Sequence, residues 1–535
     1  MTTDLKTSQG ATVADEKSMA GVTPTTANPS NDDDIEIGSI SPAKLDRAEE
    51  FLRDNDISHE QVQELVEDTA ANKALIRKVD KIMLPLLMGT YVLQYIDKQA
   101  LAYAAVFDLL TDTNMSGDQY SNLTTFFYLG YLVAEYPWSY LAQKGSVAMV
   151  VSGCVVCWGT VLMLAAACTS YSGLAACRFF LGVFEAPITP CFMMIVGMWY
   201  MREQQPFRAG LFYCCNGVGS MIGGVVTYGI GRGLQNKDFP VWKVIFMLCG
   251  GCTILWGITL YFLMPADIMS TKRLNNTEKA TLIGRGWSNQ TGILNRQIKW
   301  YQIREALMDP QVWILFLYTF LNELINGGFA NFGKLILKGV VKGSLQTTAL
   351  AIPQGAFQVF FILSGTFMAS RLKNFRTVIM AIYIVPTIIG ISLMWQLPRT
   401  NKYGNLFGYY ITGSFVSALV VALQMPASNL GGYTKRVTGT AFVFLAYCLG
   451  NIIGPHAFLA KESPRYPTGC KLIIGCAVGQ IFLACCLRLL LTRRNKARDA
   501  AAVVSGVAEE KKKFGGHEAM QDLTDFENPD FRYVL

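Results

Sequence analysis

The chain has 535 residues, of which 51% are hydrophobic and 16% are charged, and its net charge is +7. A soluble domain has about 25% charged residues, so this composition excludes an ordinary soluble protein and indicates a polytopic membrane protein. The basic residues cluster between apolar runs and at helix ends, where the positive-inside bias of membrane proteins explains them. Nucleic acid is therefore not an expected partner, whereas the lipid bilayer is.

The first 41 residues are polar and rich in Thr, Ser, Asp and Asn, without the apolar segment that a cleavable signal sequence requires. We expect residues 1–41 to form a disordered cytosolic tail. Apolar residues at helical spacing then predict a cytosolic helical segment over 42–81. Ser41 and Pro42 are suited to begin its first helix as N-cap and first helical residue.

Apolar runs of about 18 or more residues predict twelve transmembrane helices and an all-α integral membrane fold. We expect an N-terminal six-helix bundle over 82–264, a cytosolic central loop over 265–309, a C-terminal six-helix bundle over 310–492 and a cytosolic tail over 493–535. The predicted spans are 82–106, 121–141, 147–168, 171–198, 207–231, 242–264, 310–333, 345–370, 376–397, 404–425, 434–458 and 470–492. Two six-helix halves are typical of transporters that bind their solute between the halves, near the bilayer midplane.

Lys and Arg are more frequent in the loops that lie inside if the N-terminus is cytosolic, which favours both termini in the cytosol. Lys334, Lys338 and Lys342 are the exception, because they fall on the predicted outside. This basic cluster is either an ordinary solvated face or a group that attracts an anionic solute.

The first span contains Asp97 and Lys98 about two thirds of the way along its apolar sequence. Adjacent residues of a helix point about 100° apart, so these two side chains do not pair with one another. A charge at the centre of a bilayer costs a few kcal/mol, so each needs a partner on another helix.

The fourth span contains Arg178 and Glu185, which are two helical turns apart and therefore share one face. The available opposite charges pair Lys98 with Glu185, or Asp97 with Arg178. Such pairs either fix helix packing only or form a binding and ion-coupling site, and four charges in two helices favour the second interpretation.

Further polar residues in the spans leave two interpretations each. Glu323 either forms an interhelical hydrogen bond or takes part in ion coupling, and Glu135 either contacts Lys144 or a helix end or has a functional role. The pair Gly327–Gly328 after Asn326 indicates either a helix break beside a cavity or a close helix crossing. Several amides either bind solute or hold helices together: Gln94, Asn216, Gln354, Gln358, Gln424 and Asn451. Gly217, Gly219, Gly223 and Gly224 favour close packing over a nucleotide loop.

The sequence contains no P-loop, no nucleophile elbow and no Cys/His spacing for a metal site, so we expect neither an enzyme nor a bound cofactor. Most of the 14 cysteines lie in apolar runs and are expected to be small apolar helix residues.

Five phrases carry a resemblance to a known family: YVLQYIDKQALAYA, FFYLGYLVAEYP, RFFLGVFEAPITP, EQQPFRAGLFYCCNG and TKRVTGTAFVFLAYCLGNIIGP. Over about residues 75–492 the chain resembles the major facilitator superfamily and, within it, the anion:cation symporters of the fungal allantoate-permease type. The resemblance implies two six-helix bundles, alternating access, and cotransport of an organic anion with a cation, usually H⁺. We expect a monomer in the plasma membrane.

Members of this family use an acidic-basic pair in helix one and an Arg with a Glu two turns later in helix four, which match Asp97, Lys98, Arg178 and Glu185 here. Lys98 stands where Arg is usual, and a lysine is a point charge, not a bidentate fork. The loop motif after helix two is degenerate, and GVGSMIGG in span five lacks the Gly-Pro of proton antiporters, which argues against drug export.

The hypothesis is proton-coupled symport of a small organic anion such as allantoate, another ureido acid, a carboxylate vitamin or a similar nutrient. Protonation of a carboxylate would free a cation to bind the anionic group. The expected substrate-binding residues are Arg178, Lys98, Asn216, Gln94, Asn326 and Asn451. The expected proton-coupling residues are Asp97, Glu185 and Glu323. The alternatives are a nutrient sensor or receptor with the same fold, and a metabolite exporter.

Overall fold

The computed structural model describes residues 47–535 except 68, 202–203, 235–238, 270, 289–298, 342, 373, 505–522 and 529–530. The contacts divide the chain into two units, Met1–Glu50 and Phe51–Leu535. Of the first unit the structure describes only residues 47–50, where helix α1 (Arg47–Asp54) begins. The expected disordered tail over 1–41 lies outside the described residues.

The N-terminal half contains six long helical segments, and the fourth is made of two consecutive helices. These are α3 (Thr69–Val106), α5 (Gly117–Lys144), α6 (Val147–Ala165), α7 (Tyr171–Glu185) with α8 (Ile188–Trp199), α9 (Gln205–Gly233) and α10 (Val241–Leu263). The short α4 (Leu109–Asp112) connects α3 to α5. The fourth segment is interrupted directly after Glu185, where Pro187 and Pro190 lack the N–H that a continuous helix needs.

The C-terminal half repeats this arrangement of six segments. These are α13 (Pro310–Val341), α14 (Ser344–Arg371), α15 (Arg376–Ile382) with α16 (Val385–Gln396), α17 (Lys402–Thr412) with α18 (Phe415–Leu423) and α19 (Met425–Asn429), α20 (Tyr433–Ile453) and α21 (Pro467–Val504). The turns η2 (Gly454–Ala457) and η3 (Ala460–Glu462) follow α20. Each of the twelve predicted spans thus corresponds to one of these segments, and the expected all-α fold of two six-helix halves is confirmed.

Ten helical segments of the described residues are long and apolar enough to cross a membrane, which makes the chain a multi-pass membrane protein. The first two segments, α3 and α5, are 38 and 28 residues long but are not among these ten, because they carry many polar residues. Their polar faces line the cavity described below.

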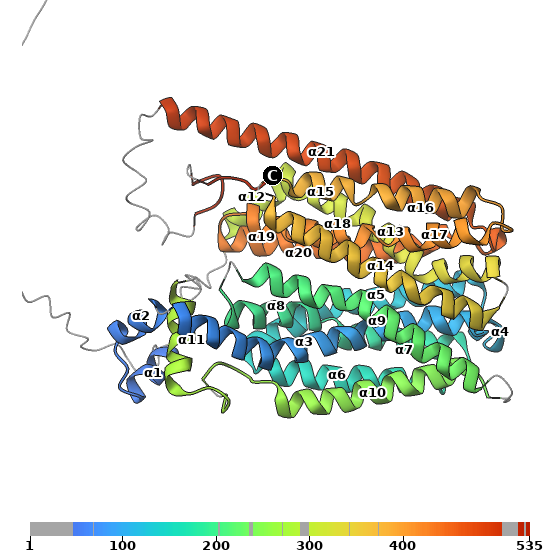
Figure 1. The fold of residues 1–535 in the computed structure, drawn as a ribbon, viewed down its shortest axis with the longest axis horizontal. Helices are drawn as coiled ribbons and strands as arrows, with labels where there is room; N and C mark the ends of the chain where they lie inside the picture. Colours follow the sequence, from blue (N-terminus) through green and yellow to red (C-terminus); the bar gives the residue numbers. More distant parts are fainter. Residues whose placement is uncertain are drawn as a thin grey trace, which may run out of the picture. The chain divides into compact units, whose positions relative to one another are not determined.

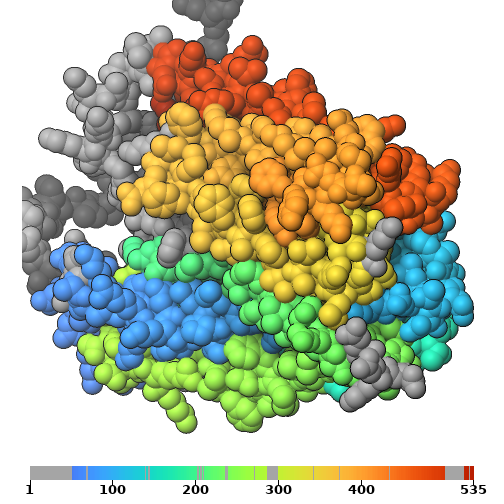
Figure 2. Space-filling view, turned by 45° about the vertical axis from the view of Figure 1, so that its right-hand side comes forward, coloured from blue at the N-terminus to red at the C-terminus, as the bar shows by residue number. Residues whose placement is uncertain are grey.

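Within Phe51–Leu535, the helices of each half lie together, and the two groups lie side by side (Figure 1). The halves meet through close backbone contact of α9 with α14, because a Cβ on Gly217 would lie 2.6 Å from the carbonyl oxygen of Gly355. They also meet through α5 and α20, where Tyr128 and Tyr447 have ring centroids 6.2 Å apart. Figure 2 shows the yellow C-terminal half lying against the blue and green N-terminal half on the face in view. Close packing at Gly217 is thereby confirmed.

Three shorter segments pack at one end of the long helices. Near that end lie α2 (His59–Glu67), α11 (Asn276–Ser288) and α12 (Trp300–Met308), whereas α4 lies at the opposite end (Figure 1). Lys78 of α3 binds Glu278 of α11 at 2.7 Å. The last described residues of the chain dock beside α20, where Asp525 Oδ1 lies 2.6 Å from Lys435 Nζ.

Of the two interpretations of the basic cluster, an ordinary solvated face is wrong for Lys334. Lys334 is not on a solvated face, because it lies inside α13 and is only 4% exposed. Lys338 of the same helix binds the Val106 carbonyl oxygen at 2.6 Å and Asp108 at 3.2 Å. Lys342 lies outside the described residues. The error arose because α13 extends eight residues beyond the predicted end of its span, from 333 to 341.

Candidate functional site

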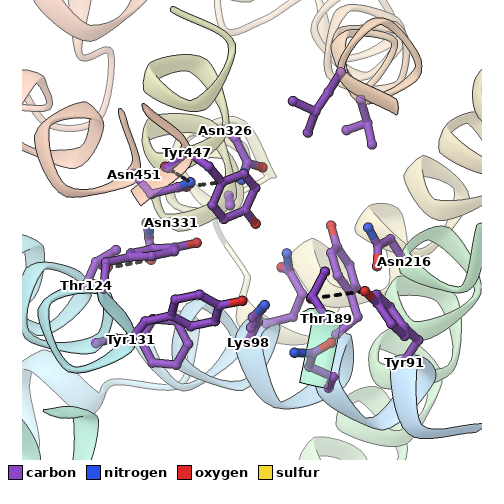
Figure 3. Close-up of a pocket in the computed structure, with 18 of the residues that line it drawn as sticks. Tyr91, Lys98, Thr124, Tyr131, Thr189, Asn216, Asn326, Asn331, Tyr447 and Asn451 are labelled. Carbon is purple, nitrogen blue, oxygen red and sulfur yellow. Dashed lines mark hydrogen bonds between the residues drawn. The ribbon is translucent and has the colours of Figure 1, made fainter. Parts of the chain in front are cut away.

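A polar cavity of about 1220 Å³, including the space at its mouth, lies between the two halves. Its walls come from α3, α5, α7, α8 and α9 of one half and from α13, α14, α18 and α20 of the other. All six residues expected to bind substrate line it: Gln94, Lys98, Arg178, Asn216, Asn326 and Asn451. Figure 3 shows residues of both halves around this space.

An ion pair joins α3 to α7 at the wall of the cavity. Lys98 Nζ lies 2.8 Å from Glu185 Oε1, and the Glu185 side chain is fully buried whereas that of Lys98 is 26% exposed. Figure 3 shows the Lys98 amine directed toward the open space. Of the two pairings that the sequence allowed, the structure contains this one. Lys98 therefore separates the buried carboxylate from the cavity.

The other possible pair, Asp97 with Arg178, is not formed. Asp97 is buried and accepts hydrogen bonds from Trp158 Nε1 at 2.8 Å and from Thr253 Oγ1 at 2.9 Å. These donors belong to α6 and α10, so Asp97 fastens α3 to two neighbouring helices and does not line the cavity.

Arg178 lines the cavity without a carboxylate in contact. Among the described residues none of its nitrogens lies within 4.0 Å of an Asp or Glu oxygen, and Nη2 is buried without a hydrogen-bond partner. The guanidinium lies 5.9 Å from the centre of the Phe246 ring. This cation therefore has donors available for an anionic group.

Glu323 of α13 forms the corresponding buried group of the C-terminal half. It accepts hydrogen bonds from Asn326 Nδ2 at 2.9 Å and from Asn451 Nδ2 at 2.6 Å, and Asn326 also donates to Asn451 at 3.1 Å. Both asparagines line the cavity, whereas Glu323 lies behind them, fully buried. A change of charge on Glu323 would alter the hydrogen bonds that these amides offer.

The glycines after Asn326 explain why α13 and α20 approach so closely. A Cβ on Gly327 would lie 2.9 Å from the backbone of Asn451, and α13 continues through this position to Val341. The close helix crossing is confirmed, and the alternative of a helix break is wrong.

Several cavity residues were missed by the sequence analysis. Tyr91 donates to Thr189 Oγ1 at 3.1 Å, and Thr124 donates to Asn331 Oδ1 at 3.2 Å, as Figure 3 shows. The others with polar groups are Tyr95, Gln99, Tyr128, Tyr131, Tyr213 and Tyr447. One signal was available, because Tyr91, Gln94, Tyr95 and Lys98 recur at helical spacing on one face of α3. Gln358, one of the amides with two interpretations, also lines the cavity.

A set of polar contacts joins the halves where α3 ends and α5 begins. Tyr120 donates to the Asn331 carbonyl oxygen at 3.3 Å, Thr125 Oγ1 lies 2.9 Å from His456 Nε2, and Lys338 reaches Val106. These contacts hold the halves together at the end where α4 lies.

A membrane protein of two six-helix halves, with a polar cavity between them and cations in its wall, has the architecture of a secondary transporter. The family model described as "Major Facilitator Superfamily" matches residues 87–455. The chain belongs to this superfamily and, within it, to the allantoate-permease type that the sequence resembles.

The curated relatives are fungal transporters. An uncharacterized transporter of Schizosaccharomyces pombe is 34% identical over 91% of this chain and 90% of its own length. The allantoate permease of Saccharomyces cerevisiae is 31% identical, with 89% of each chain covered. A thiamine pathway transporter of the same yeast is 29% identical over 94% of this chain and 96% of its own. The chain is therefore a transporter of the superfamily.

Among solved structures, a bacterial homologue of the human lysosomal transporter Spinster, in an inward-facing and occupied conformation, matches with a TM-score of 0.54. The match covers 77% of this chain and 96% of that one at 16% sequence identity. It shows the fold alone.

Proposed function

We propose that this transporter couples uptake of a small organic anion to H⁺ by alternating access in the plasma membrane, with both termini in the cytosol. The observation that carries the proposal is the ion pair between Lys98, which faces the cavity, and Glu185, which is fully buried behind it. A single buried carboxylate thereby controls how much positive charge the cavity presents.

In the proposed cycle, a proton on Glu185 neutralises the partner of Lys98 and leaves the ammonium free for the anion. Arg178, which has no carboxylate in contact, adds a second donor group from the same half. Removing an opposite charge from beside a cation strengthens its attraction for a new anion in a site of low dielectric constant. Proton and solute therefore favour the same loaded state.

The remaining residues have supporting roles in this proposal. Gln94 and Asn216 offer amides from the N-terminal half, and Asn326 and Asn451 offer amides whose orientation depends on Glu323. Protonation of Glu323 would release these amides toward the solute. Protonation of Asp97 would weaken its bonds to α6 and α10 and so loosen α3, which carries Lys98.

The substrate class follows from the cations in the wall and from the relatives. We infer a small carboxylate such as a ureido acid or a carboxylate vitamin, in keeping with the similarity to allantoate permease. An inside-negative membrane potential would drive uptake further if more protons than negative charges move together.

The test uses the full chain in proteoliposomes with radiolabelled allantoate and nicotinate. An imposed inward pH gradient should drive accumulation by the wild type. Glu185→Gln should retain solute exchange but lose pH-driven accumulation. Glu135→Gln is the matched control, because Glu135 is a carboxylate of α5 that does not line the cavity.

Unchanged accumulation by Glu185→Gln would refute the assigned role of Glu185. Binding of these solutes without flux would identify a sensor instead. Outward movement of the solute while the imposed gradient drives protons inward would identify an exporter.

A further inference from the structure

A third cation, Lys334, borders the site from the opposite half. Lys334 of α13 lines a small cavity together with Tyr95, Gln99, Asn326 and Gln358, and these four residues also line the main cavity. The two spaces therefore adjoin, and we refer to them as the main lobe and the smaller lobe. Lys98 and Arg178 line the main lobe and Lys334 lines the smaller lobe.

Lys334 is buried without a counter-charge. It is 4% exposed, it donates a hydrogen bond to Gln99 Oε1, and its amine lies 3.8 Å from the centre of the Tyr103 ring. Among the described residues no carboxylate oxygen lies within 4.0 Å of it. A neutral amide and an aromatic ring compensate a buried ammonium only in part.

Among the described residues, the other buried lysine has a different environment. Lys435, which is 0% exposed, lies within 4.0 Å of Glu305, Asp309 and Asp525. Buried charges in proteins are normally paired in this way. Lys334 is therefore a buried amine whose anionic partner the described residues do not supply, at the wall of a solute cavity.

Lys98 and the residue that Lys334 contacts are neighbours on α3. Lys98 and Gln99 are adjacent on α3, and Gln99 is the residue that Lys334 contacts from the other half. We propose that Lys334 binds a second anionic group of the solute, so that the preferred substrates are short dianions, such as dicarboxylates, held between the two halves. This inference rests on the proposed transport of organic anions.

Binding of a dianion would also change the contact between the halves. Lys334 now connects α13 to Gln99 and Tyr103 of α3. A carboxylate at Lys334 would replace these contacts with a neutral amide and a ring by an ion-paired hydrogen bond, in which both the donor and the acceptor are charged. A monoanion bound by Lys98 and Arg178 would leave Lys334 in contact with Gln99 and Tyr103 of α3.

The experiment compares dicarboxylates with their own monoamides, which have nearly the same size and shape but one charge less. Succinate and glutarate are measured against succinamate and glutaramate, by exchange at pH 7 in proteoliposomes that contain the full chain. In parallel, thermal stabilisation of the purified protein by each compound reports binding without transport.

We expect the wild type to prefer each dicarboxylate over its monoamide by about tenfold or more in KM. Lys334→Gln should abolish this preference while exchange of the monoamide continues, which also demonstrates that the variant is folded. Lys334→Arg should restore the preference for the dicarboxylate. Lys338→Gln, one helical turn further along α13, removes another lysine that contacts the opposite half and should leave the ratio unchanged.

The inference is overturned if the wild type does not distinguish the two classes, or if Lys334→Gln and Lys338→Gln shift the ratio equally. Exchange of monoamides without a preference for dicarboxylates would overturn the inference and leave the proposed anion transport intact. Absence of pH-driven transport of any carboxylate would overturn the proposed function, and thermal stabilisation of wild type and Lys334→Gln would then still decide the role of Lys334.

Discussion

The C-terminal end of the chain is held by a buried ion-pair cluster whose strength can be measured. Asp525 is 0% exposed, and its Oδ1 lies 2.6 Å from Lys435 Nζ, which also contacts Glu305 at 2.8 Å and Asp309 at 3.3 Å. Asp525 accepts further hydrogen bonds from Tyr533 Oη at 2.7 Å and from the Gly431 backbone at 3.1 Å. Burial, and then the charge of Asp525, raises the pKa of the Tyr533 phenol, so this donor stays protonated.

Asp525→Asn removes the charge and preserves the shape of the side chain. Removal of one partner from a buried ion pair costs about 3–5 kcal/mol. Because Lys435 keeps two other carboxylates, we expect the lower end of this range, about 3 kcal/mol. At 1.4 kcal/mol for each factor of ten, the C-terminal segment should detach roughly 100-fold more often.

Hydrogen exchange of the Val534 amide reports this detachment, because that amide donates to Asn429 Oδ1 at 2.8 Å. The control is Asp499→Asn, which breaks the 3.0 Å pair with Arg532 at side chains that are 64% and 39% exposed. An exposed pair contributes less than about 1 kcal/mol. Equal acceleration of exchange in the two variants would refute the argument that burial decides the strength of these pairs.

Two further predictions concern helix packing and the contact of α11 with α3. Gly182→Ala should destabilise the folded protein by roughly 3 kcal/mol, because the new Cβ would overlap the Phe127 carbonyl oxygen where α7 crosses α5. The control is Gly153→Ala, whose Cβ meets no atom within 4 Å, so this variant should be neutral. Thermal inactivation in detergent measures both variants, and similar half-lives would contradict the prediction. Partial burial alone would raise the pKa of Glu278, but its hydrogen bonds, first of all that from Lys78, outweigh burial and leave the pKa below its usual value of 4.5. The stabilising contribution is therefore present above pH 4.5 and lost as the pH falls through the lowered pKa, so hydrogen exchange of α11 should accelerate with acid in the wild type and should lack this pH dependence in Glu278→Gln.

The course of the helices could be predicted from local sequence because hydropathy and helix length depend on neighbouring residues only. Even α3 and α5, which are too polar to stand out by hydropathy, could be recognised as spans. Six cavity residues could also be predicted from local sequence, because a polar side chain within an apolar helix is energetically costly unless it faces a polar space. The tyrosines of the cavity were missed because a tyrosine is ordinary in a membrane helix.

The sequence by itself determined that charges on the first and fourth spans must face the interior, because helical periodicity and the cost of a charge in lipid leave no other arrangement. It left two pairings open. Only the tertiary structure decided that Lys98 binds Glu185 while Asp97 binds Trp158 and Thr253, because a pairing depends on the rotation and depth of helices that are distant in sequence. The same reason applies to Lys334, for which the local pattern left a solvated face and an anion-attracting group open and which three-dimensional packing buries beside α3.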